Sequence, residues 1–203
     1  MSINKPKLAG ILIAAGNSSR LGQSKQLIKY QNLNLLNRSV ALAEFATQNV
    51  WVILGSEAEQ HSHSIVSKSV NLINNENWQQ GMGTSIAKGI ACLSEEYDGA
   101  LILLCDQWAL EQSDLFSLIS RWQKNTDKIV CSQYYDQKAN SEISGAPAIF
   151  PSAYFKQLSN LRDTGARKIL QQNPQDVISL NLPNAGHDLD TPEDLTKLLS
   201  RRS

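Results

Sequence analysis

An apolar run passes into a loop of small and basic residues in Leu8-Ala9-Gly10-Ile11-Leu12-Ile13-Ala14-Ala15-Gly16-Asn17-Ser18-Ser19-Arg20-Leu21-Gly22-Gln23-Ser24-Lys25. The run is continuous rather than alternating, which is typical of a strand buried on both faces of a sheet. In the loop, Gly16 and Gly22 can adopt positive φ angles, and Arg20 and Lys25 supply positive charge. Small residues with accessible backbone N–H groups beside two basic side chains favour binding of a polyphosphate.

Further apolar runs alternate with amphipathic stretches along the chain, which predicts a doubly wound α/β fold. We expect a three-layer α/β/α arrangement around a mainly parallel sheet of about seven strands, with ligands bound beyond the carboxyl ends of the strands. The expected strands are Leu8–Ala14, Val50–Leu54, Val70–Ile73, Ala100–Leu104, Ile129–Cys131, Pro147–Phe150 and Val177–Leu182, and the expected helices are Leu35–Gln48, Ser85–Leu93, Ser113–Trp122, Ala153–Leu158, Ala166–Gln172 and Pro192–Leu199.

The loop after the first strand matches none of the common phosphate-binding or nucleophile motifs. Five residues separate Gly16 from Gly22, whereas a Walker A loop has four, and Lys25 comes three residues after Gly22. The dinucleotide-binding glycine pattern is absent, and Arg20 stands where a serine nucleophile elbow needs glycine. The alternative interpretation is an ordinary β-to-α turn with two surface bases.

Carboxylates follow two predicted strands. Asp106 comes directly after a buried strand and suits magnesium binding or, alternatively, a cap of the following segment. Asp188 and Asp190 alternate as strand residues do, so we expect them on one face. Thr191, Pro192 and Asp194 form a good helix start. Capping accounts for those three residues but not for Asp188 and Asp190.

The composition is that of a folded protein without bulk charge. The chain has 203 residues, 41% of them hydrophobic, and a formal net charge of zero, which predicts a single domain over residues 1–203 and argues against nucleic-acid binding. The longest apolar run is too short to cross a membrane. The charged residues are nevertheless unevenly distributed along the chain, because no Asp or Glu precedes Glu44. The bases in that acid-free segment are Lys5, Lys7, Arg20, Lys25, Lys29 and Arg38.

The sulfur and imidazole groups give no metal motif. Cys92, Cys105 and Cys131 are odd in number and widely spaced, which favours reduced, mostly buried thiols in a cytoplasmic protein. We interpret His61 and His63 as part of a solvated loop or helix face rather than a metal site.

Six ordered motifs, including the loop, resemble the MobA-like nucleoside-triphosphate transferase family, in particular the branch of molybdenum cofactor cytidylyltransferases and the related guanylyltransferase. They cover nearly the whole chain, and one departure is Trp108, where relatives commonly have proline. The motifs are Ala14-Ala15-Gly16-x-Ser18-x-Arg20-Leu21-Gly22-x-x-Lys25-Gln26-Leu27, Asn77-Trp78-x-x-Gly81-Met82-Gly83-Thr84-Ser85, Leu104-Cys105-Asp106-Gln107, Gly145-Ala146-Pro147-Ala148-Ile149-Phe150, Asp163-x-Gly165-Ala166-Arg167 and Asp188-x-Asp190-Thr191-Pro192-Glu193-Asp194-Leu195.

The resemblance implies a Rossmann-like sheet of the nucleotide-diphospho-sugar transferase type and assigns roles to individual residues. Arg20, Lys25 and Asp106 are expected to be catalytic, and Asp106 and Asp190 to hold Mg²⁺, with Mn²⁺ as a substitute. Gly145, Pro147 and Arg167 are expected on the acceptor side. The expected nucleotide-binding residues are Ala14, Ala15, Gly16, Ser18, Arg20, Gly22, Lys25, Gly83, Thr84, Ser85 and Asp106; from the residues alone, Gly81 to Ser85 also fit a turn and a helix cap.

The resemblance also implies the substrates. The expected reaction transfers CMP from CTP to the phosphate of molybdopterin or molybdenum cofactor, releases pyrophosphate, and includes transient contact with a molybdoenzyme or its chaperone. The methyl group of Ala15, where the guanylyltransferase branch has glycine, favours a pyrimidine. The alternatives are a cytidylyl- or guanylyltransferase acting on another phosphorylated small molecule, and a non-catalytic protein that delivers a nucleotide or cofactor.

Overall fold

A central sheet of seven strands, in the order β5-β4-β1-β6-β8-β7-β9, organises the computed structural model, which describes residues 5–136 and 139–200. The strands are β1 (Leu8–Ile13), β4 (Asn49–Leu54), β5 (Asn71–Asn74), β6 (Gly99–Leu104), β7 (Ile129–Asp136), β8 (Ser141–Pro151) and β9 (Val177–Asn181), and a separate two-stranded sheet joins β2 (Lys29–Tyr30) and β3 (Leu33–Asn34).

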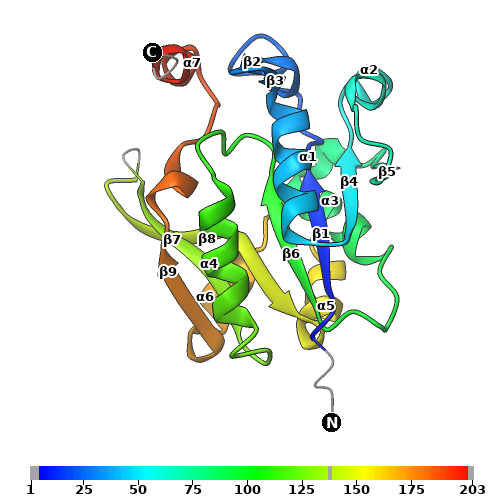
Figure 1. Cartoon of the computed structure of the whole chain (residues 1–203), viewed down its shortest axis with the longest axis vertical. Coiled ribbons are helices and arrows are strands. Elements are labelled where there is room, and N and C mark those ends of the chain that lie inside the picture. The colour runs from blue at the N-terminus through cyan, green and yellow to red at the C-terminus, as the bar shows by residue number, and fades with distance from the viewer. Residues whose placement is uncertain (1–4, 137–138, 201–203) are drawn as a thin grey trace.

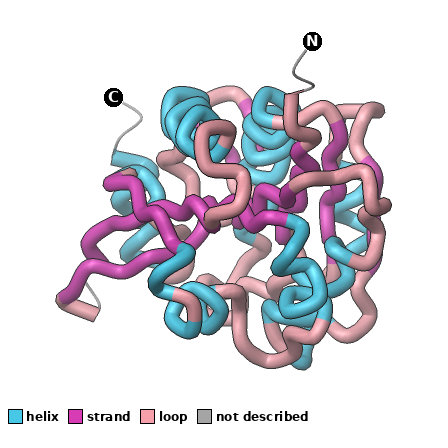
Figure 2. The backbone as a smooth tube through the Cα atoms, turned by 90° about the horizontal axis from the view of Figure 1, so that it is seen from below, coloured by secondary structure: helices cyan, strands magenta, loops and turns pink. Residues whose placement is uncertain are grey.

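Helices cover both faces of this sheet (Figures 1 and 2). The apolar side chains of α1 and α4 pack into one core cluster, and those of α3, α5 and α6 pack into a second cluster on the other face. The predicted three-layer α/β/α fold is therefore confirmed. The helices are α1 (Leu35–Ala46), α2 (Ala58–Ser64), α3 (Met82–Ile90), α4 (Gln112–Trp122), α5 (Phe155–Ser159), α6 (Arg167–Gln172) and α7 (Pro192–Ser200).

The sheet is mainly parallel, as predicted. β1 lies between β4 and β6 and runs parallel to both. The side chains of Ile11 and Leu12 in β1 are fully buried. The exception is β8, which pairs antiparallel with β6 and with β7. The continuous apolar runs were therefore a sound guide to the strands that are covered on both faces.

Two strands are much longer than predicted. The expected strands Ile129–Cys131 and Pro147–Phe150 are only the buried ends of β7 and β8, which continue as an antiparallel pair that includes Tyr134 opposite Ile143. The register shifts between Cys131 and Ser132. Beyond that point the residues are mixed in polarity, because ladder hydrogen bonds rather than two-sided burial hold this part of the pair.

The carboxyl ends of β1 and β6 meet at the end of the molecule that carries α7 (Figure 1). Ile13 is in register with Leu104, and the backbone N–H of Cys105 donates to the carbonyl of Ile13 over 3.1 Å. The loop after β1 and the loop after β6 therefore begin side by side. Sequence-distant residues that follow these two strands are brought to one edge of the sheet.

The described residues include no helix long and apolar enough to cross a membrane. Cys105 and Cys131 are buried, Cys92 is partly exposed, and all three are free thiols. Burial raises the pKa of the Cys105 thiol to about 12, so the thiol stays protonated near neutral pH.

Candidate active site

The loop after β1 is fixed by one buried side chain. Gln26 is 1% exposed, and its Nε2 donates to the carbonyls of Ala14 (3.0 Å) and Gly16 (2.8 Å). Its Oε1 accepts a hydrogen bond from the hydroxyl of Ser18 over 3.3 Å, and the same hydroxyl accepts from the backbone N–H of Lys25 over 3.1 Å. Gln26 therefore closes the loop on itself, a role the sequence did not predict because nothing in the motif separates it from its neighbours.

The backbone of this loop differs in detail from the expectation. Gly22 has φ of 75°, but Gly16 does not have a positive φ angle, and Ser18 takes that conformation instead with φ of 55°. A Cβ atom added at Gly16 would meet nothing within 4 Å. The side chains of Ala14 and Ala15 are buried in the protein. The positive φ angle expected of Gly22 is therefore present and that of Gly16 is not. Ser18 can hold the left-handed conformation because it bonds locally to Gln26 and Lys25.

Four charged side chains from three distant segments meet beyond the sheet edge. The Nζ atom of Lys25 lies 2.6 Å from Oδ2 of Asp106 and 3.0 Å from Oδ1 of Asp190. The guanidinium of Arg20 lies 3.0 Å from Oδ2 of Asp190. The side chain of Lys25 is only 14% exposed, whereas that of Arg20 is 68% exposed. The predicted basic and acidic residues are therefore brought together into one cluster, which we call the charged cluster.

Electrostatics favour the charged form of Lys25 in this cluster. Burial opposes protonation, but attraction to Asp106 and Asp190 and the hydrogen bonds to them outweigh it, so the pKa of Lys25 is raised above its ordinary value. The amine remains protonated throughout the physiological range. Lys25 is therefore a fixed positive charge at this edge of the sheet.

The backbone carbonyl of Asp106 joins the segment of Asp106 to the segment that carries Asp190. It accepts hydrogen bonds from the N–H of Trp108 (2.9 Å) and of Leu189 (3.0 Å). Trp108 is buried, and its ring contacts Tyr30 edge-on at 5.4 Å between centroids. Proline at position 108 has no N–H to make the first bond, so tryptophan here contributes to holding Asp106 in place.

The start of α7 fixes the segment that contains Asp190. The side chain of Asp194 accepts from the backbone N–H and the hydroxyl of Thr191, and the backbone N–H of Asp194 lies 3.3 Å from the Thr191 hydroxyl. Capping therefore accounts for Thr191 and Asp194, as expected. Asp188 and Asp190 instead line the cavity described next.

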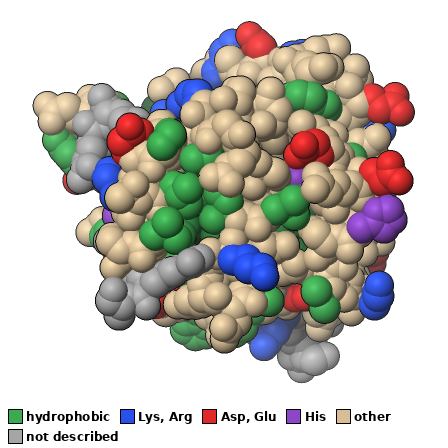
Figure 3. All heavy atoms as spheres, turned by 90° about the horizontal axis from the view of Figure 1, so that it is seen from above, with side chains coloured by type: hydrophobic (Ala, Val, Ile, Leu, Met, Phe, Trp, Pro, Cys, Tyr) green, Lys and Arg blue, Asp and Glu red, His purple; other side chains and the backbone are tan. Residues whose placement is uncertain are grey.

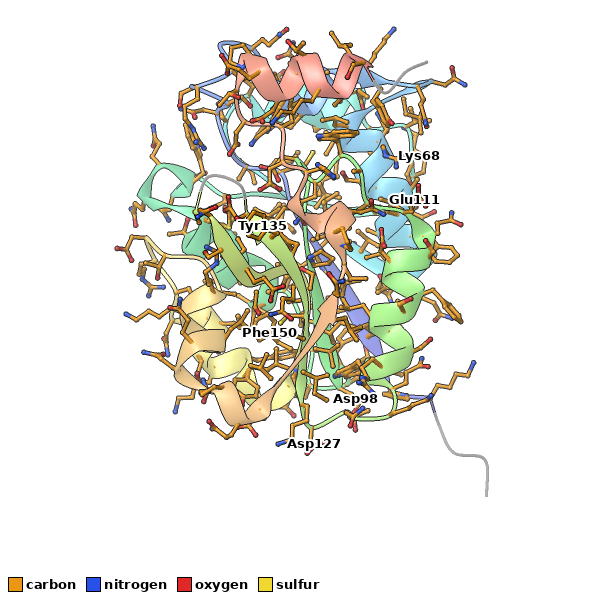
Figure 4. The ribbon with its side chains drawn as sticks, turned by 90° about the vertical axis from the view of Figure 1, so that its left-hand side faces the viewer. Lys68, Asp98, Glu111, Asp127, Tyr135 and Phe150 are labelled. Atoms are coloured by element: carbon orange, nitrogen blue, oxygen red, sulfur yellow. The ribbon has the colours of Figure 1, made fainter. Side chains whose placement is uncertain are left out.

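A cavity of about 790 Å³ opens beside the charged cluster. Figure 3 looks from above onto this end of the molecule, where hydrophobic side chains lie beside Lys and Arg side chains. One wall is apolar and comes from α3, β6 and β8, and it includes Phe150, which Figure 4 labels. Gly145 and Arg167, which were expected on the acceptor side, also line the cavity. The cavity thus joins an apolar wall to a strongly charged rim.

Pro147, the third residue expected on the acceptor side, is buried and is not among the residues that line the cavity. It follows a cis peptide bond with Ala146, whose carbonyl accepts from Nε2 of Gln107 (2.7 Å) and from the hydroxyl of Ser132 (2.8 Å). Of the three residues expected on the acceptor side, the cavity lining therefore includes Gly145 and Arg167 but not Pro147.

Tyr134 is a cavity residue that the sequence did not predict. It lines the cavity next to Gly145 and Arg167, and a Cβ atom added at Gly145 would lie 3.6 Å from its hydroxyl. Burial, with the nearby charge of Asp188, raises the pKa of Tyr134 to about 12, so the phenol keeps its proton. The predicted strand ended at Cys131, which left the polar continuation of β7 and Tyr134 on it unassigned.

The segment from Gly83 to Ser85 does not face the cavity with its polar atoms. Nδ2 of Asn75 donates to the hydroxyls of Thr84 and Ser85, each over 2.9 Å, and both side chains are buried. From the same helix, Met82 and Ile86 line the cavity. The hydroxyls expected to contact a nucleotide are engaged inside the protein, because they bind the end of β5 to the start of α3.

Packing alone requires glycine at position 83. A Cβ atom there would lie 2.4 Å from the carbonyl oxygen of Thr164 and 2.5 Å from that of Arg162. We expect Gly83→Ala to lower the free energy of unfolding by about 1–3 kcal/mol, because the backbone from Arg162 to Thr164 must move to make room for the methyl group. Urea titration measures the loss. Gly16→Ala, which adds the same methyl group in open space, is the matched control, and equal midpoints for the two variants would contradict the explanation.

His61 is also corrected by the structure. The segment around it forms α2 and His63 is exposed on it, as expected of a solvated helix face, but His61 is only 1% exposed. Its Nε2 lies 2.7 Å from the hydroxyl of Ser24 in the loop after β1. The burial of His61 could not be predicted from the polar sequence of the helix, because it depends on contact with a loop that is distant in the sequence.

The model of the MobA-like NTP transferase domain matches residues 10–177. The chain is 25% identical to nicotine blue oxidoreductase of Paenarthrobacter nicotinovorans (96% of this chain, 97% of the relative) and 26% identical to a probable molybdenum cofactor guanylyltransferase of Rhodopirellula baltica (94% and 90%). It is 23% identical to the molybdenum cofactor cytidylyltransferase of Escherichia coli (91% of each chain).

Among solved structures, the fold is similar to that of Rv0371C of Mycobacterium tuberculosis in a complex with manganese. The TM-score is 0.79 at 21% identity, over 97% of this chain and all of that one. At this identity, the likeness supports the fold.

Proposed function

Because the chain belongs to the MobA-like NTP transferase family, we propose that it transfers CMP from CTP to the phosphate of a molybdenum-cofactor pterin, with Mg²⁺, and releases pyrophosphate. The observation that carries the proposal is the charged cluster. It sets two basic side chains from one loop against two carboxylates at the rim of a large cavity. Phosphoryl-group chemistry needs this combination of positive charge for phosphate and carboxylate for metal.

The donor set suits a hard divalent cation. Oδ1 of Asp106 is buried and has no hydrogen-bond partner among the described residues, so an acidic oxygen is left for another ligand. Within residues 5–136 and 139–200, no group of three or more His, Cys, Asp or Glu side chains is arranged to hold a metal. Asp106 and Asp190 would therefore share the ion with phosphate oxygens of the nucleotide, as is common for Mg²⁺. When bound, the ion supplies charge neutralisation at the α-phosphate and the leaving pyrophosphate.

The chain's own residues have the remaining tasks of binding and orientation. An oxygen of the acceptor phosphate forms a bond to the α-phosphorus of the nucleotide, and the bond from that phosphorus to the pyrophosphate oxygen breaks. Lys25 and Arg20 bind the triphosphate, and Lys25 stabilises the charge that develops on the leaving group. No covalent intermediate with the protein is required, so correct alignment of the two phosphates is the main contribution.

CTP is the favoured donor because Ala15 carries a methyl group where the guanylyltransferase branch has glycine. This methyl group is buried, so it would act by setting the position of the loop rather than by contacting the base. The carbonyl of Ala15 accepts from the N–H of Ser56 over 3.0 Å, so the backbone at this residue is fixed by the segment after β4. GTP is the alternative donor, supported by similarity to a probable guanylyltransferase. The alternatives for the acceptor are another phosphorylated small molecule or none, as in a delivery protein.

On the acceptor side, Arg167 supplies a guanidinium suited to a phosphate, and the apolar wall suits a flat ring system. The Tyr134 phenol, which keeps its proton, can donate to an acceptor oxygen. These features support a phosphorylated heterocycle as acceptor and do not distinguish a pterin from other rings of similar size.

A thermal-shift panel with CTP, GTP, ATP and UTP tests the donor. At a CTP concentration 100 times its Kd, with Mg²⁺ present, we expect a stabilisation of about 2.7 kcal/mol, or an increase in Tm of about 5–10 °C. Replacing Mg²⁺ with EDTA should remove most of the increase. A shift with GTP but not with CTP would contradict the choice of base and retain the transferase assignment.

Product mass tests the acceptor. Incubation with CTP, Mg²⁺ and molybdopterin should yield the cytosine dinucleotide of the pterin together with one pyrophosphate per product. Nucleotide binding without a dinucleotide, with either CTP or GTP, would favour another acceptor or a delivery role.

A further inference from the structure

A chain of hydrogen bonds joins α2 to the loop after β1. Nε2 of His61 lies 2.7 Å from the hydroxyl of Ser24, and this hydroxyl lies 3.1 Å from Oε1 of Gln26. Nε2 of Gln26 reaches the carbonyls of Ala14 and Gly16. Ser24 and Gln26 are the two sequence neighbours of Lys25, so the chain of bonds holds both sides of the residue at the centre of the charged cluster.

The partners fix the direction of each of these bonds. Two backbone carbonyls can only accept, so the amide of Gln26 must direct its NH₂ group toward them and its oxygen toward the serines. A hydroxyl within hydrogen-bond distance of that oxygen must then donate to it. Ser24 has one proton and uses it on Gln26, which leaves its oxygen as the acceptor for His61. We therefore assign the proton of the His61 imidazole to Nε2.

The surroundings of His61 favour the neutral ring with that proton. Burial lowers the pKa of His61 below its ordinary value, although the Glu57 carboxylate, 3.8 Å from Nε2, and the backbone of Ser56 act in the opposite direction. Nδ1 is buried and has no hydrogen-bond partner among the described residues. The imidazole therefore donates from Nε2 to Ser24, and its Nδ1 is enclosed by the protein.

We propose that His61 is a positioning residue for the nucleotide-binding loop: by donating to Ser24 it fixes Ser24 and Gln26 and thereby the place of the Lys25 ammonium. The catalytic consequence rests on the proposed function, whereas the structural consequence does not. The same helix region contributes further, because the N–H of Ser56 bonds the carbonyl of Ala15 over 3.0 Å. Together, α2 and the segment before it hold both ends of the loop.

Hydrogen exchange measured on peptides of the full chain tests the structural part. In His61→Leu, which keeps a buried apolar group but removes the donor, amides of residues 18–27 should exchange about tenfold faster, while amides of β6 keep their protection. His61→Gln retains an N–H donor and should restore the slow exchange. His63→Leu, the same substitution two residues away on an exposed position, is the matched control and should leave exchange unchanged.

Ser24→Ala removes the next link and provides a second, independent variant. It should reproduce the faster exchange of residues 18–27, and combining it with His61→Leu should add little, because both substitutions break the same chain of bonds. Additive effects of the two substitutions, or faster exchange spread evenly over all peptides, would overturn the proposal in favour of general packing. So would a His61→Gln variant that behaves like His61→Leu.

Pyrophosphate release tests the catalytic part. In His61→Leu, kcat should fall about tenfold with a smaller change in KM for the nucleotide, since a displaced Lys25 acts mainly in the transition state. Unchanged kcat in a variant whose loop exchanges faster would overturn the catalytic consequence. Absence of any turnover by the unsubstituted protein would instead count against the proposed function, and the exchange experiment would still decide the role of His61.

Discussion

We expect replacement of Lys25 by methionine to lower the rate of pyrophosphate release in the proposed reaction by about a hundredfold or more. Methionine keeps much of the length and apolar surface of the side chain but removes the ammonium that lies 2.6 Å from Asp106 and 3.0 Å from Asp190. Without it, the leaving group would lose a fixed positive charge, Asp106 loses its ion-pair partner, and Asp190 is left paired with Arg20. Steady-state kinetics with saturating nucleotide measure the effect on kcat.

Lys68→Met is the matched control for this variant. Lys68 is exposed and is labelled in Figure 4, and it does not line the cavity beside the charged cluster. Its turnover should equal that of the unsubstituted protein. If Lys25→Met retained full turnover, Lys25 would have no role in the transition state and the assignment would be withdrawn.

Asp106→Asn should reduce turnover by about a thousandfold and abolish the metal-dependent part of nucleotide binding. The amide is similar in shape to the carboxylate but carries no charge, so it is a poor ligand for a hard divalent cation. Titration of the nucleotide in the presence of Mg²⁺ and in the presence of EDTA separates the two contributions to binding. The two titrations should give different affinities for the unsubstituted protein and nearly equal ones for the variant.

Asp98→Asn is the control at the opposite end of the same strand. Asp98 is exposed and directly precedes β6, whereas Asp106 follows it by two residues, and Figure 4 shows Asp98 at the end of the molecule away from α7. Its Oδ2 accepts from the backbone N–H of Lys7, and an asparagine oxygen can still accept there. A loss of metal-dependent binding in both variants would mean that general stability, not the site, was measured.

The central strands can be predicted from the sequence because they are buried on both faces. The runs that became β1, β4 and β6 are continuous and apolar, so their pattern has one explanation. The outer parts of β7 and β8 are not predicted, because they are held by pairing with each other and tolerate polar side chains. The helix α2 is not predicted either, because it is short and polar and its one buried side chain, His61, contacts a distant loop.

The candidate site is predicted as a set of residue types but not as a set of contacts. The rule that ligands bind beyond the strand ends selects Arg20, Lys25 and Asp106, and the structure brings them together with Asp190. Direct pairing between the bases and the acids was not expected, because each was assigned to a ligand. The role of Gln26 depends on backbone carbonyls that the chain presents only after the loop has folded.

The charged cluster has a consequence for the order in which the molecule assembles. Its ion pairs join residues separated by 81, 165 and 170 positions along the chain, so they form only after most of the sheet is in place. Leu189 and Leu198 belong to a small apolar cluster apart from the two large ones, and this cluster anchors the C-terminal segment that carries Asp190. The second carboxylate of the charged cluster is therefore in place only when that segment is packed against the rest of the molecule.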